Sequence, residues 1–179
     1  MTFKLLSATL LALGLGACAA PGIDHYRNEK PTLDLQHYLN GTLDAWGVFQ
    51  GRSGEVKKRF HVVIDARWQG DTGVLDERFS WSDGTTSRRV WTLTRQADGT
   101  YRGRADDVIG EAVGELAGNA LRWRYVLALP VNGKTYHVDF DDWMFLMDDR
   151  VMLNRSYMSK WGIGLGEVTL TFVKRPATP

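Results

Sequence analysis

Alternation of apolar and polar residues, interrupted by short turns, most constrains the fold of this chain. In residues 59–68, Phe60, Val62, Ile64 and Trp68 fall on one face, and polar residues occupy most of the other. Successive side chains of a strand point to opposite faces, so this pattern predicts a half-buried strand. Sequences typical of tight turns then recur along the chain: Gly70-Asp71, Asp83-Gly84, Asp98-Gly99, Gly118-Asn119, Asn132-Gly133 and Asp148-Asp149.

The segments between these turns predict consecutive antiparallel strands, and no stretch after residue 45 has the period of a helix. A row of hairpins must protect its two edge strands, and closure does this best. We therefore predict an all-β fold, an up-and-down antiparallel β-barrel of eight to ten strands. A two-sheet sandwich is the alternative, although its long connections are missing. The expected strands are 46–52, 57–69, 74–82, 86–96, 100–108, 111–117, 120–130, 134–147, 150–159 and 165–174.

A short helix is expected before the first strand. Within residues 32–40, Thr32 is placed to cap it, and Leu35, Tyr38 and Leu39 share one face. We assign residues 32–179 to a single β-barrel domain.

The N-terminal residues 1–17 have the pattern of a lipoprotein signal peptide. Lys4 precedes an apolar run from Leu5 to Leu15, which is shorter than the roughly 20 residues of a membrane-spanning helix. Leu15-Gly16-Ala17-Cys18 resembles the bacterial lipobox, which predicts lipidation at Cys18. The alternative is an ordinary secretory signal with Cys18 incidental.

Residues 18–31 are then expected to be the lipidated cysteine and a polar tether between membrane and domain. Ala19 rather than Asp follows Cys18. By resemblance to enterobacterial sorting rules, this implies an outer-membrane lipid anchor, with the domain facing the periplasm.

Composition excludes several classes of partner and site. The chain has 22 Lys+Arg and 21 Asp+Glu, a balance that argues against binding nucleic acid. Its single Cys excludes an internal disulfide and any zinc site with two or more thiolates. No motif for a metal or a cofactor is found, and the sequence does not indicate an oligomeric state.

Five charged residues share predicted strand faces with large apolar residues. Unpaired charges are costly to bury, so these must pair or face a water-filled cavity. A three-residue turn, Asp83-Gly84-Thr85, would place Phe79 opposite Arg89, with Glu77 one diagonal step away. The five are Glu77, Arg89, Asp107, Asp142 and Arg155.

Two interpretations of these charges remain open. In the first, pairs such as Glu77 with Arg89, and Asp107 or Asp142 with Arg155, only fix the register of neighbouring strands. In the second, the charges form the polar floor of an apolar pocket, where Arg89 or Arg155 holds the anionic head of an amphiphile. The residues expected to line or cap that pocket are Trp46, Phe79, Trp81, Trp91, Trp123, Trp143 and Met144.

A series of short motifs runs in order through the chain: Ala45-Trp46-Gly47-Val48-Phe49, Glu77-x-Phe79, Asp83-Gly84, Arg89-x-Trp91, Asp107-Val108-Ile109-Gly110, Gly118-Asn119-Ala120, Asp141-Asp142-Trp143-Met144, Asn154-Arg155-Ser156 and Lys160-Trp161-Gly162. Together they resemble the uncharacterised proteobacterial lipoproteins grouped as domain of unknown function 3833. The resemblance covers essentially the whole mature domain. It implies a lipobox-anchored envelope protein with a lipocalin-like barrel and no established activity.

Residue patterns and resemblance together favour a binding module for a lipid or another amphiphilic small molecule. The alternative is an enzyme on the same barrel, with Glu77 or Asp142 as the acid and Asp107 as the base. A structural or assembly role in the envelope is the second alternative. The expected ligand-binding residues are Glu77, Arg89, Trp91, Asp107, Trp123, Asp142, Trp143, Asn154 and Arg155.

Overall fold

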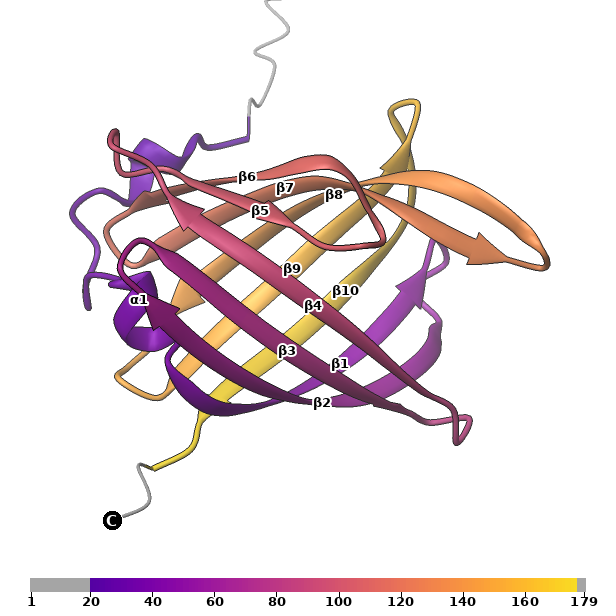
Figure 1. Cartoon of the computed structure of the whole chain (residues 1–179). Helices are drawn as coiled ribbons and strands as arrows, with labels where there is room; N and C mark the ends of the chain where they lie inside the picture. The colour runs from indigo at the N-terminus through magenta and orange to yellow at the C-terminus, as the bar shows by residue number, and fades with distance from the viewer. Residues whose placement is uncertain (1–19, 177–179) are drawn as a thin grey trace, which may run out of the picture.

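The computed structural model describes residues 20–176 and contains one closed antiparallel barrel (Figure 1). Each strand pairs with the next in sequence, and the last pairs with the first, so no edge is left. This confirms the predicted barrel and excludes the sandwich. The strands are β1 (Gly41–Gly51), β2 (Val56–Gln69), β3 (Thr72–Trp81), β4 (Thr86–Arg95), β5 (Tyr101–Arg104), β6 (Val108–Ala117), β7 (Ala120–Val131), β8 (Lys134–Leu146), β9 (Val151–Lys160) and β10 (Ile163–Lys174).

One end of the barrel is covered by the short helix α1 (Leu35–Tyr38), and we call it the closed end (Figure 1). The N-cap is Asp34 rather than the expected Thr32, because its carboxylate accepts a hydrogen bond from the backbone N–H of His37 at 3.0 Å. Leu35, Tyr38 and the following Leu39 are buried, as their shared face predicts. The Tyr38 hydroxyl donates to the Arg150 carbonyl at 3.1 Å and so fastens the helix to the barrel rim.

The segment before α1 lies against the outside of the barrel. A 3₁₀ helix, η1 (Ile23–Tyr26), contacts β6 and β7, and the Tyr26 ring lies 5.1 Å from that of Phe145. The Leu33 N–H donates to the carbonyl of Gly118, in the β6–β7 turn at the closed end, at 2.8 Å. This part of the expected tether is therefore packed against the domain. The predicted signal peptide and Cys18 lie outside the described residues.

Within residues 20–176, no helix is long and apolar enough to cross a membrane.

Glycines in β5 and β6 make room for the indole ring of Trp123 on the inner face of the barrel wall. A Cβ built on Gly103 would lie 2.3 Å from Cζ2 of Trp123, and one on Gly114 would lie 2.5 Å from Cε3 of the same ring. These separations are far below van der Waals contact. The ring therefore lies across positions where only glycine fits, and this close packing leaves Trp123 buried.

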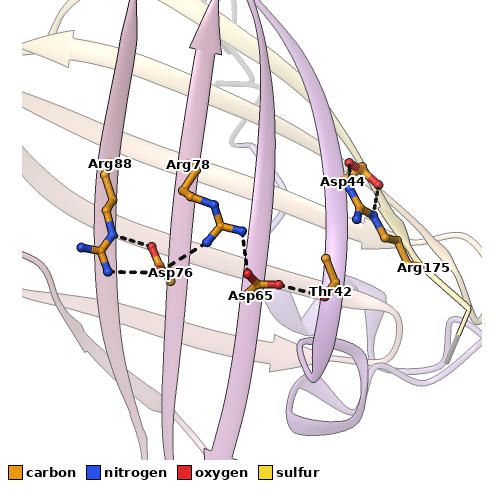
Figure 2. Close-up of polar contacts among 7 residues, drawn as sticks. All are labelled: Thr42, Asp44, Asp65, Asp76, Arg78, Arg88 and Arg175. Carbon is orange, nitrogen blue, oxygen red and sulfur yellow. Dashed lines mark hydrogen bonds and ion pairs between the residues drawn. The ribbon is translucent and has the colours of Figure 1, made fainter. Parts of the chain in front are cut away.

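Ion pairs cross the outer wall from strand to strand (Figure 2). Arg88 on β4 donates to Asp76 at 2.8 Å, and Arg78 on β3 donates to Asp65 on β2 at 2.6 Å. The Thr42 hydroxyl on β1 also donates to Asp65, at 2.8 Å. The guanidinium groups hold the pKa values of both carboxyls below their usual range. Each exposed ion pair contributes little to the free energy of unfolding, but together the pairs match the observed register of the strands.

Replacement of Gly103 by Ala tests the close packing of the indole. We expect Gly103→Ala to lower the free energy of unfolding by about 1–3 kcal/mol, the usual cost of overpacking. Gly164→Ala is the matched control, because no atom lies within 4 Å of a Cβ placed there. Chemical denaturation measures both variants. Equal stability of the two would contradict the steric role of Gly103.

Candidate ligand-binding site

The barrel encloses a cavity of about 850 Å³. Leu35 and Leu39 bound it at the closed end, and most of its wall is apolar or aromatic. At the opposite end it is lined by Lys57, Lys58 and Asn132, which are exposed, so the cavity reaches solvent there. We call this the open end. A volume of this size is typical of small-molecule pockets.

A charged cluster lies on the β3–β4 side of the cavity. Glu77 on β3 stands directly opposite Arg89 on β4. Arg89 donates to both oxygens of Asp107, with Nε at 3.0 Å from each and Nη2 at 2.8 Å from Oδ2. The guanidinium carbon also lies 6.0 Å from the Trp91 ring centroid. Arg89 is thus hydrogen-bonded to Asp107 and stands beside Glu77 inside the barrel.

The register of this hairpin differs from the expectation. Phe79 pairs with Ser87 rather than with Arg89. The turn begins one residue earlier than predicted, because the backbone N–H of Trp81 donates to the carbonyl of Thr85 at 2.9 Å. This shift moves Glu77 from a diagonal position to the one opposite Arg89.

A second polar cluster lies across the cavity on β8 and β9. Asp142 is 6% exposed, and Ser156 stands opposite it on β9. The Ser156 hydroxyl donates to Oδ1 of Asn154, which is 4% exposed, at 3.1 Å. The ring of Tyr125 on β7 packs flat against Phe140 at 5.0 Å between centroids. Polar groups here are therefore enclosed by aromatic walls.

Burial raises the pKa of Glu77 to about 7, although Arg89 and Trp91 oppose the shift. Burial likewise raises the pKa of Asp142 to about 7, although the nearby hydroxyl groups of Ser156 and Tyr125 oppose the shift. Burial also works against the charge of Arg89, but Asp107 and Glu77 outweigh it and hold its pKa above the ordinary value. Near neutral pH the cavity therefore contains one firmly charged guanidinium and two carboxyls that readily exchange protons.

Seven of the nine expected binding residues line this cavity. They come from five different strands and one loop, and only closure of the barrel brings them together. Of the other expected aromatic and lining residues, Phe79, Trp81 and Met144 also lie there. The seven are Glu77, Arg89, Trp91, Asp107, Trp123, Asp142 and Asn154.

Arg155 and Trp143 were wrongly assigned to the interior. Arg155 lies on the outer wall, where it donates to Glu167 at 2.6 Å. It therefore pairs with neither Asp107 nor Asp142 and is not placed to hold a ligand head. Trp143 also faces outward, 5.7 Å from the Tyr26 ring of the N-terminal segment.

Trp46 is a further correction. It is 52% exposed and stacks on His61 at 5.1 Å between ring centroids, on the outer wall. Its neighbour Ala45 is the residue that lines the cavity.

Three residues that were not among the expected binding residues also line the cavity: Tyr125, Phe140 and Ser156. Tyr125 follows Trp123 by two positions on β7, and Ser156 follows Asn154 by two on β9, so each pair shares a face. That spacing would have identified both from the residues already chosen.

Among the described residues, no group of three or more His, Cys, Asp or Glu side chains is arranged to hold a metal ion.

The sequence profile of a family described as "Protein of unknown function (DUF3833)" matches residues 12–174. The chain belongs to this family. Among curated proteins, none matches its sequence.

Similar solved structures include an S-type phycobiliprotein lyase, CPES, from Guillardia theta. It is 7% identical, with a TM-score of 0.63 over 88% of this chain and 100% of that one. A redesigned β-barrel, mFAP0, bound to DFHBI, is 13% identical, with a TM-score of 0.42 over 76% of this chain and 99% of that one. The likeness to the lyase supports the lipocalin-like fold of the DUF3833 chain and shows the fold alone.

The two interior carboxyls predict an unusual dependence of stability on pH. The ordinary pKa values are 4.5 for Glu77 and 3.8 for Asp142, and both rise to about 7 on folding. Between these values the native state binds more protons than the unfolded state. Lowering the pH from 8 to about 5 should therefore increase the free energy of unfolding, until the outer carboxylates begin to protonate.

The variant Asp142→Asn should be more stable than the parent at pH 8 by more than about 1 kcal/mol, and less sensitive to pH. Asp141→Asn is the matched control, because Asp141 faces outward and pairs with Arg122 at 2.7 Å. Denaturant unfolding from pH 5 to 8 makes the comparison. A parent stability that instead rises up to pH 8 would disprove the assignment.

Proposed function

We propose that this DUF3833 barrel binds a lipid or another amphiphilic small molecule in its interior. One observation carries the proposal: a cavity of about 850 Å³ that is mainly apolar, open at one end and supplied with a few convergent polar groups. A barrel built only for rigidity would fill its centre with side chains. The phycobiliprotein lyase of similar fold supports the proposal only as an analogy between scaffolds.

The distribution of polar groups inside the cavity supports a ligand with a mixed surface. The charged cluster of Glu77, Arg89 and Asp107 is set partway along the barrel, between Leu75 towards the closed end and Trp81 towards the open end. An apolar body can extend in both directions from this level, while a polar part meets hydrogen-bonding groups. Arg89 is already engaged by Asp107, which argues against its holding a full anionic head alone.

We further propose that the domain is anchored by lipid at Cys18 to the outer membrane and faces the periplasm. The support is the signal-like run before Cys18 and the residues around it. A binding protein held at a membrane meets lipid at a high effective concentration.

An enzyme acting on a lipid-like molecule is the second candidate function. The observation that favours it is the pair of cavity-lining carboxyls, Glu77 and Asp142, with pKa values of about 7, where proton transfer is most efficient. Asp107 is less suited to the role of base than expected, because both its oxygens accept hydrogen bonds from Arg89.

Obstruction of the cavity tests the binding function. Val168 lines the cavity and stands opposite Ser156, while its neighbour Thr169 is exposed on the outer wall. We expect Val168→Trp to weaken binding of the fluorescent hydrocarbon diphenylhexatriene at least tenfold, and Thr169→Trp to leave it unchanged. Fluorescence titration measures both. Failure of the parent protein to bind the probe would count against an internal site, and mass spectrometry showing a chemically altered bound lipid would favour the enzyme.

Substitution of the cysteine tests the anchor independently. In a proteobacterial host, Cys18→Ser should prevent lipidation, so the protein should no longer be processed and held as a lipoprotein. Fractionation of membranes and metabolic labelling with palmitate provide the measurement, and Ser7→Ala is a control within the same leader. A Cys18→Ser protein that is still processed and still labelled would rule out the anchor.

A further inference from the structure

Two buried polar atoms that line the cavity have no hydrogen-bond partner. They are Oδ1 of Asp142 and Nδ2 of Asn154. Their residues are 6% and 4% exposed, so bulk water does not compensate them from outside the barrel. Buried polar groups in native proteins are nearly always hydrogen-bonded, and an exception at a cavity wall indicates a missing partner.

Ser156 fixes the orientation of the Asn154 side chain, next to Asp142 on the cavity face. Its hydroxyl donates to Oδ1 of Asn154 at 3.1 Å, which leaves the Asn154 amide nitrogen to point elsewhere. Asp142 is paired with Ser156 across β8 and β9, and Met144 with Asn154, so the two residues are diagonal neighbours on the cavity face. One unpartnered acceptor therefore lies next to one unpartnered donor.

Neither Asn119 nor the charged cluster around Arg89 offers the same combination of unpartnered atoms at the cavity wall. Asn119 also has an unpartnered oxygen, but it lies in the β6–β7 turn and does not line the cavity. Around the charged cluster, Asp107 has both oxygens engaged by Arg89. The β8–β9 pair thus combines a cavity position with an unmet donor and an unmet acceptor.

The complement of this pair is an N–H group next to a carbonyl oxygen. An ammonium group would satisfy Asp142 but would leave the donor of Asn154 without a partner. A carboxylate would satisfy Asn154 but would bring a negative charge beside Asp142, with Glu77 and Asp107 in the same cavity. An uncharged amide, donating to Asp142 and accepting from Asn154, satisfies both.

We propose that Asp142 and Asn154 recognise an amide or lactam group on an otherwise apolar ligand. This inference rests on the proposed function, since it names the chemical class of molecule that the cavity binds. The rings of Trp123 and Tyr125, which lie next to Asp142 along the β7 face, enclose the recognised group and exclude competing water. Specificity then arises because any ligand lacking one of the two groups leaves a buried atom unpaired.

Three probes with the same hydrocarbon chain test this recognition: dodecanamide, dodecanoate and dodecylamine. Each is measured by displacement of diphenylhexatriene from the full domain at pH 7.5. We expect dodecanamide to bind at least tenfold more tightly than either of the others. Equal affinities, or a preference for the acid or the amine, would overturn the proposal.

Variants of adjacent residues on β9 give the matched control. Asn154→Leu should reduce the affinity for dodecanamide, relative to that for diphenylhexatriene, about tenfold, whereas Arg155→Leu on the outer wall should leave this ratio unchanged. Asn154→Asp, which keeps the size of the side chain, provides the same test if the leucine variant does not fold. An unchanged ratio in the Asn154 variants would disprove the role of this residue.

These results separate the two proposals. If the parent protein binds diphenylhexatriene but shows no preference for the amide, the cavity function stands and the recognition of an amide fails. If the parent binds neither diphenylhexatriene nor any of the three probes, both fail.

Discussion

The contact between Arg89 and Asp107 is the interaction on which the interior of this barrel depends. A guanidinium beside the Phe79 and Trp91 rings would be too costly to bury without a paired carboxylate. Asp107 supplies three short contacts from the loop between β5 and β6, and so connects that loop to β4 across a part of the wall where β5 is short. The charge of Glu77 is then tolerated beside Arg89, because this cation offsets part of the cost of its burial.

Closure of the sheet explains how so many polar groups share one interior. In an open sheet, the residues of β3 and those of β8 would face the same solvent side without meeting. Pairing of β1 with β10 curves the wall until Glu77 and Asp142 line the same cavity. The Trp123 ring packs against the backbone of the neighbouring strands, and the glycines there leave the space that it needs.

Most of the fold could be predicted from the sequence, because alternation and turn residues are local signals. All ten strands occur near their expected positions, although β5 is much shorter than residues 100–108. The errors at Trp143 and Arg155 share a physical cause. Asp142 and Trp143 were both placed inside, as were Asn154 and Arg155, yet neighbouring residues of a strand point to opposite faces.

The β9 error shows why polarity alone was misleading. Leu153 and Tyr157 share the outer face with Arg155, while Asn154 and Ser156 share the cavity face. The cavity face also includes Met152 and Met158, so both faces of this strand mix apolar and polar residues, and polarity alone does not decide which face points inward. Trp143 is covered by Tyr26 of the N-terminal segment, a long-range contact that no local pattern indicates. The β3–β4 register depended on one residue in the turn, which sequence does not resolve.

The packing of η1 beside the closed end has a consequence for orientation. The opening lies at the far end of strands of 10 to 14 residues, roughly 30 Å away along a tilted barrel. In a chain fixed to a bilayer through its N-terminal segment, the closed end would therefore lie nearer to the anchor than the opening does. A molecule from that bilayer would have to pass along the outside of the domain before it entered the cavity, so the separation between anchor and opening would affect how readily the barrel takes it up.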